Sequence, residues 1–168
     1  GYPASNVPLH RKTAIAQAIG KEFFTLLELV PKKDAFLNPG DEVYIGEGKR
    51  DKVHHINGKL DVMKLTGTAQ NELKFVLSDL VKKNETRFVD FFNKSGPLSL
   101  RMHQLELLPG LGKKHMKEIL EKREEQPFES FEDVKRRVKA MPAPNEAIVK
   151  RIMTELEGTQ KHNLFVRQ

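Results

Sequence analysis

The residue types best suited to hold a phosphate group occur together at residues 109–115. A Pro-Gly-Leu-Gly turn at residues 109–112 separates two apolar-periodic segments, and two lysines and a histidine follow the turn directly. The proline ends a first short helix, whereas the two glycines permit backbone angles that a side chain forbids and let another molecule approach closely. A second helix that begins near Gly112 presents free N–H groups and a positive dipole end to an anion. We therefore expect a phosphate-binding helical hairpin formed by Gly110, Leu111, Gly112, Lys113, Lys114 and His115.

This segment resembles the helix-hairpin-helix family, whose members grip the sugar-phosphate backbone of nucleic acids without reading sequence. Residues 127–134 resemble the continuation common in that family, in which Ser130 is the expected N-cap of the next helix. The resemblance also implies that the turn holds a monovalent cation such as K⁺ or Na⁺ when nucleic acid is bound, through the backbone carbonyls of Glu106, Leu108 and Leu111. The alternative to this ion is an ordered water in the same place. The alternative is a hairpin that only packs against the rest of the chain or contacts another protein.

A second, degenerate copy of the hairpin lies 33 positions downstream. The shift aligns six apolar or proline positions with residues of the same kind, namely Leu105, Leu108, Pro109, Met116, Ile119 and Leu120 with Val138, Met141, Pro142, Val149, Ile152 and Met153. The glycines are not repeated, because the turn becomes Ala143-Pro-Asn145 and loses the close backbone approach. Residues 131–157 are thus predicted to form a pseudo-hairpin that completes the core, with any direct contacts coming from Lys135, Arg136, Arg137 and Lys139.

The composition favours a small cytoplasmic binding protein. The 168 residues suffice for one or two modest domains, and the absence of cysteine excludes disulfides and thiolate zinc sites. No apolar run approaches the roughly 20 residues that span a bilayer, and no signal-peptide pattern opens the chain, so no membrane partner is expected. The net charge of +6 favours a polyanionic partner only weakly, because residues 1–94 and residues 95–168 share the excess equally.

The N-terminal half is predicted to be mainly β. Short strand-compatible runs occur at residues 14–20, 23–30, 43–45, 53–56 and 59–62. The Asn57-Gly58 pair between the last two runs predicts a tight hairpin turn. Five short strands with tight turns indicate a small closed or partly open barrel, and an OB-like form is favoured by analogy with folds that bind oligonucleotides. The boundary with the helical half is expected within residues 61–67.

A glycine-rich basic loop at residues 46–52 is the candidate site of that barrel. Its two glycines let a ligand come near, and Lys49, Arg50 and Lys52 could donate hydrogen bonds to phosphate oxygens. A solvated hairpin tip is an equally good interpretation of this loop taken alone. Four aromatic residues occur in the strand region, and most of them are expected in the core: Phe23, Phe24, Phe36 and Tyr44.

Two bridging helices are expected at residues 66–95, between a barrel at residues 1–65 and a helical domain at residues 96–168. The first carries one apolar stripe, and Thr66 is its expected N-cap. The second contains Phe88, Phe91 and Phe92, whose crowding indicates packing at a domain interface. The alternative is that these phenylalanines form an exposed surface for a protein partner.

Evidence for catalysis is weak in the sequence. His54 and His55 are adjacent and are expected to point to opposite sides of a strand, so both cannot join one catalytic or metal cluster. No Walker-type or dinucleotide-type glycine pattern occurs. We therefore expect no enzyme activity, no small-molecule substrate and no cofactor apart from the cation implied at the hairpin.

Over nearly its whole length the chain resembles an archaeal family known as domain of unknown function family 655. The resemblance runs from residues 43–52 through residues 87–93 to residues 150–158. It implies an OB-like region before a helix-hairpin-helix region and a nucleic-acid-binding role, with RNA favoured over DNA. The expected fold class is α+β, with a small OB-like β-barrel followed by an all-α helix-hairpin-helix domain. The expected function is backbone-phosphate binding without strong sequence specificity, and the alternative is a protein–protein interaction module that docks through the helical half.

Overall fold

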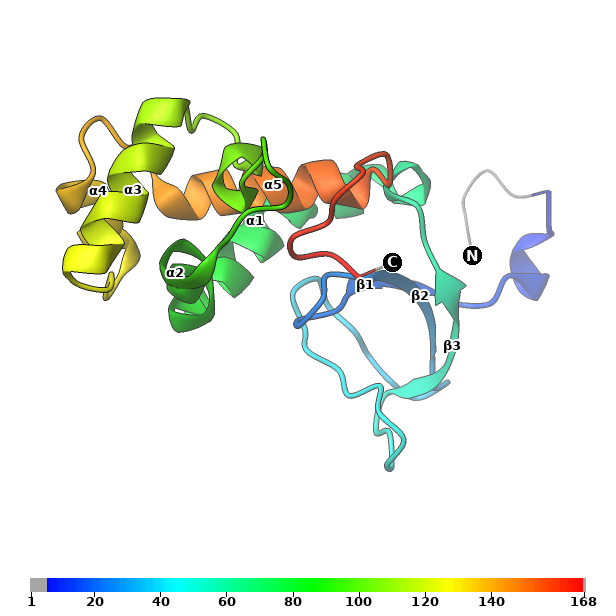
Figure 1. Cartoon of the computed structure of the whole chain (residues 1–168). Coiled ribbons are helices and arrows are strands. Elements are labelled where there is room, and N and C mark those ends of the chain that lie inside the picture. Colours follow the sequence, from blue (N-terminus) through cyan, green and yellow to red (C-terminus); the bar gives the residue numbers. More distant parts are fainter. Residues whose placement is uncertain (1–5, 168) are drawn as a thin grey trace. The chain divides into compact units, whose positions relative to one another are not determined.

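The computed structural model describes residues 6–167 and has a mixed α+β fold, as predicted (Figure 1). The chain divides into two compact units, which we call unit 1 (residues 6–72 with Arg167) and unit 2 (Leu73–Val166). The division falls inside the first long helix, α1 (Gly67–Lys83). Each unit buries its own apolar residues and is described separately below.

Unit 1 is built on a three-stranded antiparallel sheet with β2 in the middle. The strands are β1 (Ala16–Ile19), β2 (Leu26–Pro31) and β3 (Val53–Lys59). Two short 3₁₀ helices, η1 (Leu9–Arg11) and η2 (Val62–Lys64), lie before and after the sheet in the chain. The side chains buried in this unit are Phe24, Leu26, Leu29, Val53 and Leu65.

Two expectations about unit 1 are wrong. Residues 43–45 form no strand, and Asn57 and Gly58 lie inside β3 instead of forming a hairpin turn. The reason is that β3 contains two bulges: Leu29 pairs with Ile56 while Glu28 pairs with Gly58, so Asn57 is left without a partner residue on β2. A glycine beside a bulged residue accommodates the distorted backbone. The described strands therefore form an open sheet, and no closed barrel is present among them.

Unit 2 is helical and contains most of α1 followed by five further helical elements. These are α2 (Glu85–Lys94), the 3₁₀ helix η3 (Gln104–Leu107), α3 (Lys113–Glu125), α4 (Phe131–Arg137) and α5 (Pro144–Leu156). The predicted caps are confirmed at two helix starts. The Ala69 N–H donates to the Thr66 hydroxyl at 3.2 Å, and the Asp133 N–H donates to the Ser130 hydroxyl at 3.0 Å.

The phenylalanines of α2 belong to the core of unit 2. Phe88 and Phe92 are fully buried, and the ring of Phe91 lies edge-on to that of Phe165 with centroids 5.2 Å apart. The exposed partner surface considered for these residues is therefore wrong for Phe88 and Phe92. Their crowding reflects packing inside one unit.

A buried carboxylate holds the C-terminal segment of unit 2. Glu155 on α5 is fully buried, and it accepts hydrogen bonds from the backbone N–H groups of Leu164, Phe165 and Val166 at 2.9–3.0 Å. Arg151, one turn earlier, donates to the same carboxylate at 2.8 Å. Because a buried carboxylate is stable only when its oxygens are paired, this arrangement fixes a segment whose sequence has no periodicity.

Candidate nucleic-acid interface

The turn before α3 requires glycine at only one of its two glycine positions. Gly110 has φ +83°, in the left-handed region that favours glycine, as predicted. Gly112 has φ −89° and ψ 178°, which any residue adopts, so the expectation of a forbidden backbone angle is wrong there. A Cβ atom on Gly112 would meet only the His115 ring, at 3.9 Å. The missing side chain at Gly112 therefore leaves the start of α3 open to an approaching molecule.

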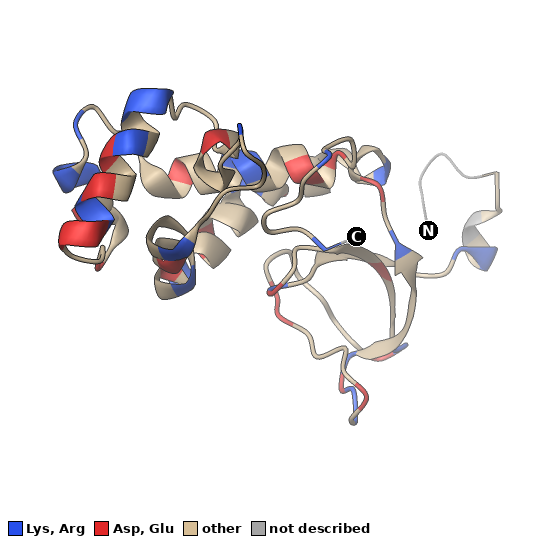
Figure 2. Cartoon of the chain, in the orientation of Figure 1, with Lys and Arg blue, Asp and Glu red and all other residues tan. Residues whose placement is uncertain are grey.

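The N-terminal end of α3 offers unpaired backbone donors together with free lysine charge. The first backbone bond of the helix runs from the Met116 N–H to the Gly112 carbonyl at 3.1 Å. The N–H groups of Lys113 and Lys114 precede this bond and have no acceptor among the described residues. Both lysine side chains are exposed, and neither forms an ion pair within the described part of the chain. Figure 2 shows this end of α3 as basic.

The charge at this end of α3 opposes helix stability. Cations are unfavourable near the positive end of a helix dipole, and carboxylates are favourable there. The first turn of α3 has no acidic residue, whereas α4 has Glu132 and Asp133 in its first turn and α5 has Glu146. Local stability therefore does not explain why Lys113 and Lys114 stand where they do.

His115 has a structural role that the sequence analysis missed. Its Nδ1 accepts the Gly112 N–H at 3.1 Å, and its Nε2 lies 3.0 Å from the Ala140 carbonyl oxygen. Since Nδ1 is the acceptor, Nε2 carries the proton and donates to Ala140. Both ring nitrogens are thus occupied, and a phosphate could bind His115 only by displacing one of these contacts. The signal available in the sequence was a capping position three residues after the N-cap glycine.

The helix before the turn is a single 3₁₀ turn capped by His103. The Leu105 N–H donates to His103 Nδ1 at 3.1 Å, and the His103 N–H donates to the Glu106 carboxylate at 2.6 Å. Burial and the positive charge of Arg123 lower the pKa of His103 below its ordinary value, against the opposing effect of Glu106. The ring is therefore neutral at pH 7, as its acceptor role at Nδ1 requires.

Three of the six aligned pairs agree in burial, although the downstream repeat itself stays a prediction. Leu105, Leu108 and Ile119 are buried, and so are Val138, Met141 and Ile152 at the positions 33 residues later. The two turns also lie together, because a Cβ atom on Gly110 would meet Cγ of Pro142 at 3.6 Å. We call the first hairpin (residues 104–125) H1 and the second (residues 131–156) H2.

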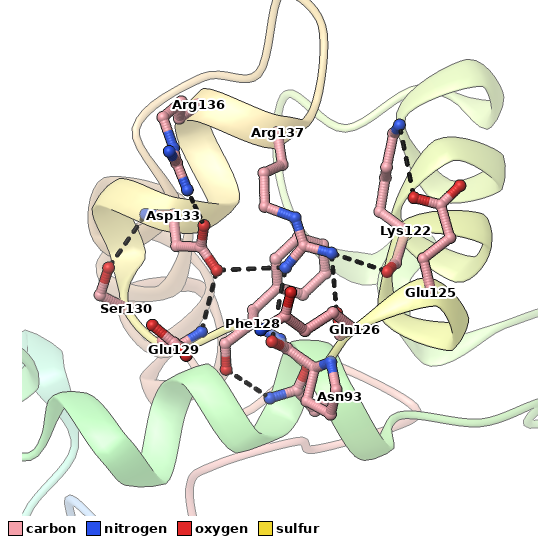
Figure 3. A network of polar contacts seen from close by, with 11 residues as sticks. Asn93, Lys122, Glu125, Gln126, Phe128, Glu129, Ser130, Asp133, Arg136 and Arg137 are labelled. Atoms are coloured by element: carbon pink, nitrogen blue, oxygen red, sulfur yellow. Dashed lines mark hydrogen bonds and ion pairs between the residues drawn. The ribbon is translucent and has the colours of Figure 1, made fainter.

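The two arginines at the end of α4 are paired with groups of their own unit (Figure 3). Arg137 donates to the carbonyls of Lys122 and Gln126 at the C-terminal end of α3, at 2.8 and 2.7 Å, and to Asp133 at 3.1 Å. Its guanidinium carbon lies 4.6 Å from the centroid of the Phe128 ring, and its side chain is only 18% exposed. The expectation that Arg137 contacts a ligand is therefore replaced by a structural role, in which it caps α3.

Asp133 balances these arginines. Burial alone would raise the pKa of its carboxyl group, but hydrogen bonds from Arg136, the Glu129 N–H and Arg137 outweigh burial and lower this pKa. Arg136 pairs with Asp133 at 2.7 Å while its side chain stays 74% exposed. Of the four cations predicted to make direct contacts in H2, Lys135 and Lys139 are exposed and have no ion pair among the described residues.

The carbonyl groups implied as cation ligands lie at the end of η3 and in the turn that follows it. The Leu108 carbonyl already accepts the Leu111 N–H at 3.3 Å, so it has one further lone pair to offer. The described side chains contain no group of three or more His, Asp or Glu residues that could hold a metal ion. A cation held by the backbone of Glu106, Leu108 and Leu111 stays a prediction.

The loop at residues 46–52 of unit 1 has two exposed lysines, Lys49 and Lys52, and one arginine that turns inward. Arg50 Nε donates to the Gly46 carbonyl at 2.9 Å, and the Arg50 carbonyl accepts a hydrogen bond from Lys32 Nζ. Glu47 and Asp51 lie in the same loop, so its net charge is only +1. The loop is an ordered element with little excess charge for gripping phosphates.

The two adjacent histidines of β3 do not point apart as expected. His54 has no partner residue on β2, because Val30 pairs with His55 and Pro31 with Val53. This bulge brings Nδ1 of His54 within 2.7 Å of Nδ1 of His55. His55 Nε2 lies 3.0 Å from the Asn57 side-chain oxygen, and the Asn57 amide donates to Glu28. The result is an exposed hydrogen-bonded chain and not a metal cluster.

Comparisons with known proteins give a family. The model of the family described as "Protein of unknown function (DUF655)" matches residues 1–167. The chain is 43% identical over 155 residues to the uncharacterized protein MJ0038 of Methanocaldococcus jannaschii, covering 91% of this chain and 70% of that protein. It is similar to the crystal structure of Af1531 from Archaeoglobus fulgidus, with a TM-score of 0.92 and 44% identity, covering 99% of this chain and 93% of the other. No helix within residues 6–167 is long and apolar enough to cross a membrane. The chain belongs to the DUF655 family.

Proposed function

We propose that this protein binds nucleic acid through backbone phosphates at the N-terminal end of α3, without strong sequence specificity. The observation that carries the proposal is a pair of exposed lysines, Lys113 and Lys114, which have no ion-pair partner within residues 6–167 and stand beside backbone N–H groups without an acceptor there. Backbone amides at a helix N-terminus and flexible lysines are donors that suit phosphate oxygens. Contacts of this kind position a nucleic acid and carry no sequence information.

The helix-hairpin-helix assignment belongs to this proposal. H1 would be the hairpin that binds, and H2 would be the pseudo-hairpin that supports it. The closeness of Gly110 to Pro142 and the His115–Ala140 hydrogen bond support such a division, because the two turns lie together and the hydrogen bond joins them. Unit 1 would be an open OB-like element. RNA is favoured over DNA on the family resemblance alone, and the proposed role is binding without catalysis.

The experiment is a salt titration of affinity for several unrelated oligonucleotides. For a binder of single strands, the logarithm of the association constant falls with the logarithm of salt concentration by about 0.7 per phosphate contact. The variant Lys113→Glu with Lys114→Ala gives H1 the residues that H2 carries at the equivalent positions, Glu146 and Ala147. We expect it to bind at least tenfold more weakly to every sequence at low salt, with a slope smaller by about 1.4.

A matched control changes the net charge equally elsewhere in unit 2. Lys74→Glu with Lys82→Ala alters two exposed lysines of α1 and should cost much less affinity. Equal losses in the two double variants would contradict a local site and indicate only long-range attraction. Failure of the wild-type protein to bind any oligonucleotide would contradict the proposed function, and salt-independent capture of a protein partner would support the alternative interaction module.

A further inference from the structure

Tyr44 is an aromatic side chain held in the open on an ordered loop. It is 58% exposed, although the sequence suggests a core position for most aromatics of this region. It lies between β2 and β3, where residues 32–52 form no strand or helix. Exposure of a large ring costs hydration free energy that burial would recover, so the contacts that keep the ring in this position need a reason.

The glycines that follow Tyr44 in the loop contact its ring and hydroxyl group. A Cβ atom on Gly46 would collide with the hydroxyl and ring carbons of Tyr44, so the hydroxyl end of the ring packs closely against Gly46 and an added side chain there would push the ring away. The Gly48 N–H donates to the Tyr44 hydroxyl at 3.3 Å. Arg50 Nε closes the loop on the Gly46 carbonyl at 2.9 Å. The hydroxyl end of the ring is therefore in contact with the loop, while the residue as a whole stays 58% exposed.

The segment that contains Tyr44 differs from the H1 turn in its net charge. Residues 32–52 carry five basic and five acidic side chains, so the segment as a whole is neutral. Because its cations are matched by carboxylates, this segment has little net attraction for a polyanion, so charge alone does not hold a nucleic acid there. Stacking on an aromatic ring needs no net charge, because every base has a π face, and it contributes strongly to the binding of unpaired nucleotides.

We infer that Tyr44 is a stacking platform for one unpaired base of a single-stranded nucleic acid, with Lys49 and Lys52 near the flanking phosphates. The inference rests on the proposed function and adds the class of polymer, because a base inside a duplex has no free face to offer. Arg50 keeps its structural role, in which its Nε donates to the Gly46 carbonyl. The terminal amino groups of Arg50 have no partner among the described residues and extend the polar edge of the loop.

The test uses the full-length protein and three probes: an oligouridine, an oligothymidine and a duplex of the same length. The chain has two tyrosines and no tryptophan, so Tyr2→Phe leaves Tyr44 as the only strong intrinsic fluorophore. In that background both single strands should quench the tyrosine emission, and the duplex should not. Tyr44→Ala should weaken single-strand binding about tenfold with an unchanged salt slope, whereas Tyr44→Phe should bind like the wild type.

Gly46→Ala tests the position of the ring without removing it. The added Cβ displaces Tyr44, so this variant should lose single-strand affinity as Tyr44→Ala does. Phe36→Ala is the matched control, because Phe36 lies in the same segment and is 84% exposed. If Gly46→Ala does not fold, the inference is tested by comparing the single-strand affinities of Tyr44→Ala and Tyr44→Phe, which change an exposed side chain.

The outcomes separate this inference from the proposed function. Wild-type affinity in Tyr44→Ala, together with a loss in Lys113→Glu with Lys114→Ala, overturns the stacking platform and supports the phosphate site. Equal losses of Tyr44→Ala on duplex and single strand overturn the choice of an unpaired base. A wild-type protein that binds none of the three probes overturns the proposed function itself.

Discussion

H1 and H2 bury equivalent apolar positions and differ in what their cations contact. In H1, Lys113 and Lys114 stand at an open helix start with no partner among the described residues. In H2, Arg137 donates hydrogen bonds to backbone carbonyls and to Asp133. The helix α5 begins with Pro144, which has no N–H group to donate to an anion. The two copies can therefore share buried positions while only H1 places unpaired lysines of the described chain at a helix start with free N–H groups.

The same contrast appears in how each helix uses its dipole. H2 follows the stabilising pattern, since α4 has acids in its first turn and Lys135, Arg136 and Arg137 in its last. H1 violates this pattern at the start of α3. Departures from local rules are expected at functional sites, where the residues serve a ligand at the expense of stability. The comparison gives three further predictions, which concern stability.

The largest effect is expected for Arg137→Ala in H2. The change removes one partner of the nearly buried Asp133 carboxylate and the side-chain donor to the carbonyls of Lys122 and Gln126, of which Lys122 keeps only the Gln126 N–H. Breaking such a pair destabilises a fold by about 3 kcal/mol. The free energy of unfolding in urea measures it, with the slope of the unfolding curve as a check that the transition itself is unchanged.

Arg136→Ala is the matched control for that change. Arg136 contacts the same carboxylate but is largely exposed, so its loss should cost less than about 1 kcal/mol. If both variants lose a similar free energy of unfolding, Arg137 behaves as an ordinary surface cation. The difference between H1 and H2 would then be limited to the start of α5 at Pro144.

The core of the repeat was predictable from sequence, and the use of its charges was not. Leu105, Ile119 and their counterparts in H2 follow helical periodicity, which reports burial directly. Arg137 and Lys113 look alike in sequence, because both are cations next to a predicted turn. Their partners are set by distant backbone groups, namely the end of α3 for Arg137 and none of the described residues for Lys113. Such choices depend on tertiary packing.

Unit 1 was less predictable because its clearest turn motif, the Asn57-Gly58 pair, lies inside a strand and forms no turn. An Asn-Gly pair between short apolar runs normally indicates a hairpin turn, and here it lies in a bulge of one strand. The bulge at His54 also reversed the expected orientation of the histidine pair. Strand periodicity assumes an uninterrupted ladder, and one inserted residue exchanges the two faces. The expectation that most aromatics of this region are buried is also wrong, since Phe36 and Tyr44 lie in a segment without strands and are exposed.

The second prediction compares the left-handed positions of the two hairpins. H1 places Gly110 at φ +83°, whereas H2 places Ala140 at φ +54°. A left-handed backbone costs an alanine about 1–2 kcal/mol, and glycine adds about 0.4–1 kcal/mol of chain entropy to the unfolded state. Gly110→Ala should therefore destabilise the protein by about 0.5–1 kcal/mol, and Ala140→Gly should stabilise it by a similar amount.

Thermal unfolding of the two single variants and of the double variant measures these opposite signs. A Cβ atom on Gly110 has ordinary contacts with Pro142, so the expected loss comes from the backbone alone. Destabilisation by Ala140→Gly would mean that the His115 contact to the Ala140 carbonyl needs the rigidity of alanine. In that case the left-handed backbone of Ala140 would be a feature that supports the H1 turn, and not merely a source of strain.

The smallest effect is an acid sensitivity confined to H1. His103 caps η3 only while its Nδ1 is unprotonated, and the equivalent position in H2 is Arg136, which does not titrate. Because folding lowers the pKa of His103, the unfolded chain takes up the proton first as pH falls. The stability contributed by the neutral ring is complete above pH of about 6.5 and is lost progressively below it. The lost cap is worth about 0.5 kcal/mol.

Amide hydrogen exchange between pH 8 and pH 5 can localise this change, after correction for the intrinsic pH dependence of exchange. Protection of the Leu105 N–H, which donates to His103, should fall in acid, while that of the Asp133 N–H, which donates to the Ser130 hydroxyl, should change less above pH of about 5. His103→Asn keeps a capping acceptor that does not titrate, so its Leu105 protection should be independent of pH in this range. Parallel losses at both amides in the wild-type protein would mean that acid loosens unit 2 as a whole, through the lowered pKa of Asp133 or another shared group, and the difference between the hairpins would not extend to their caps.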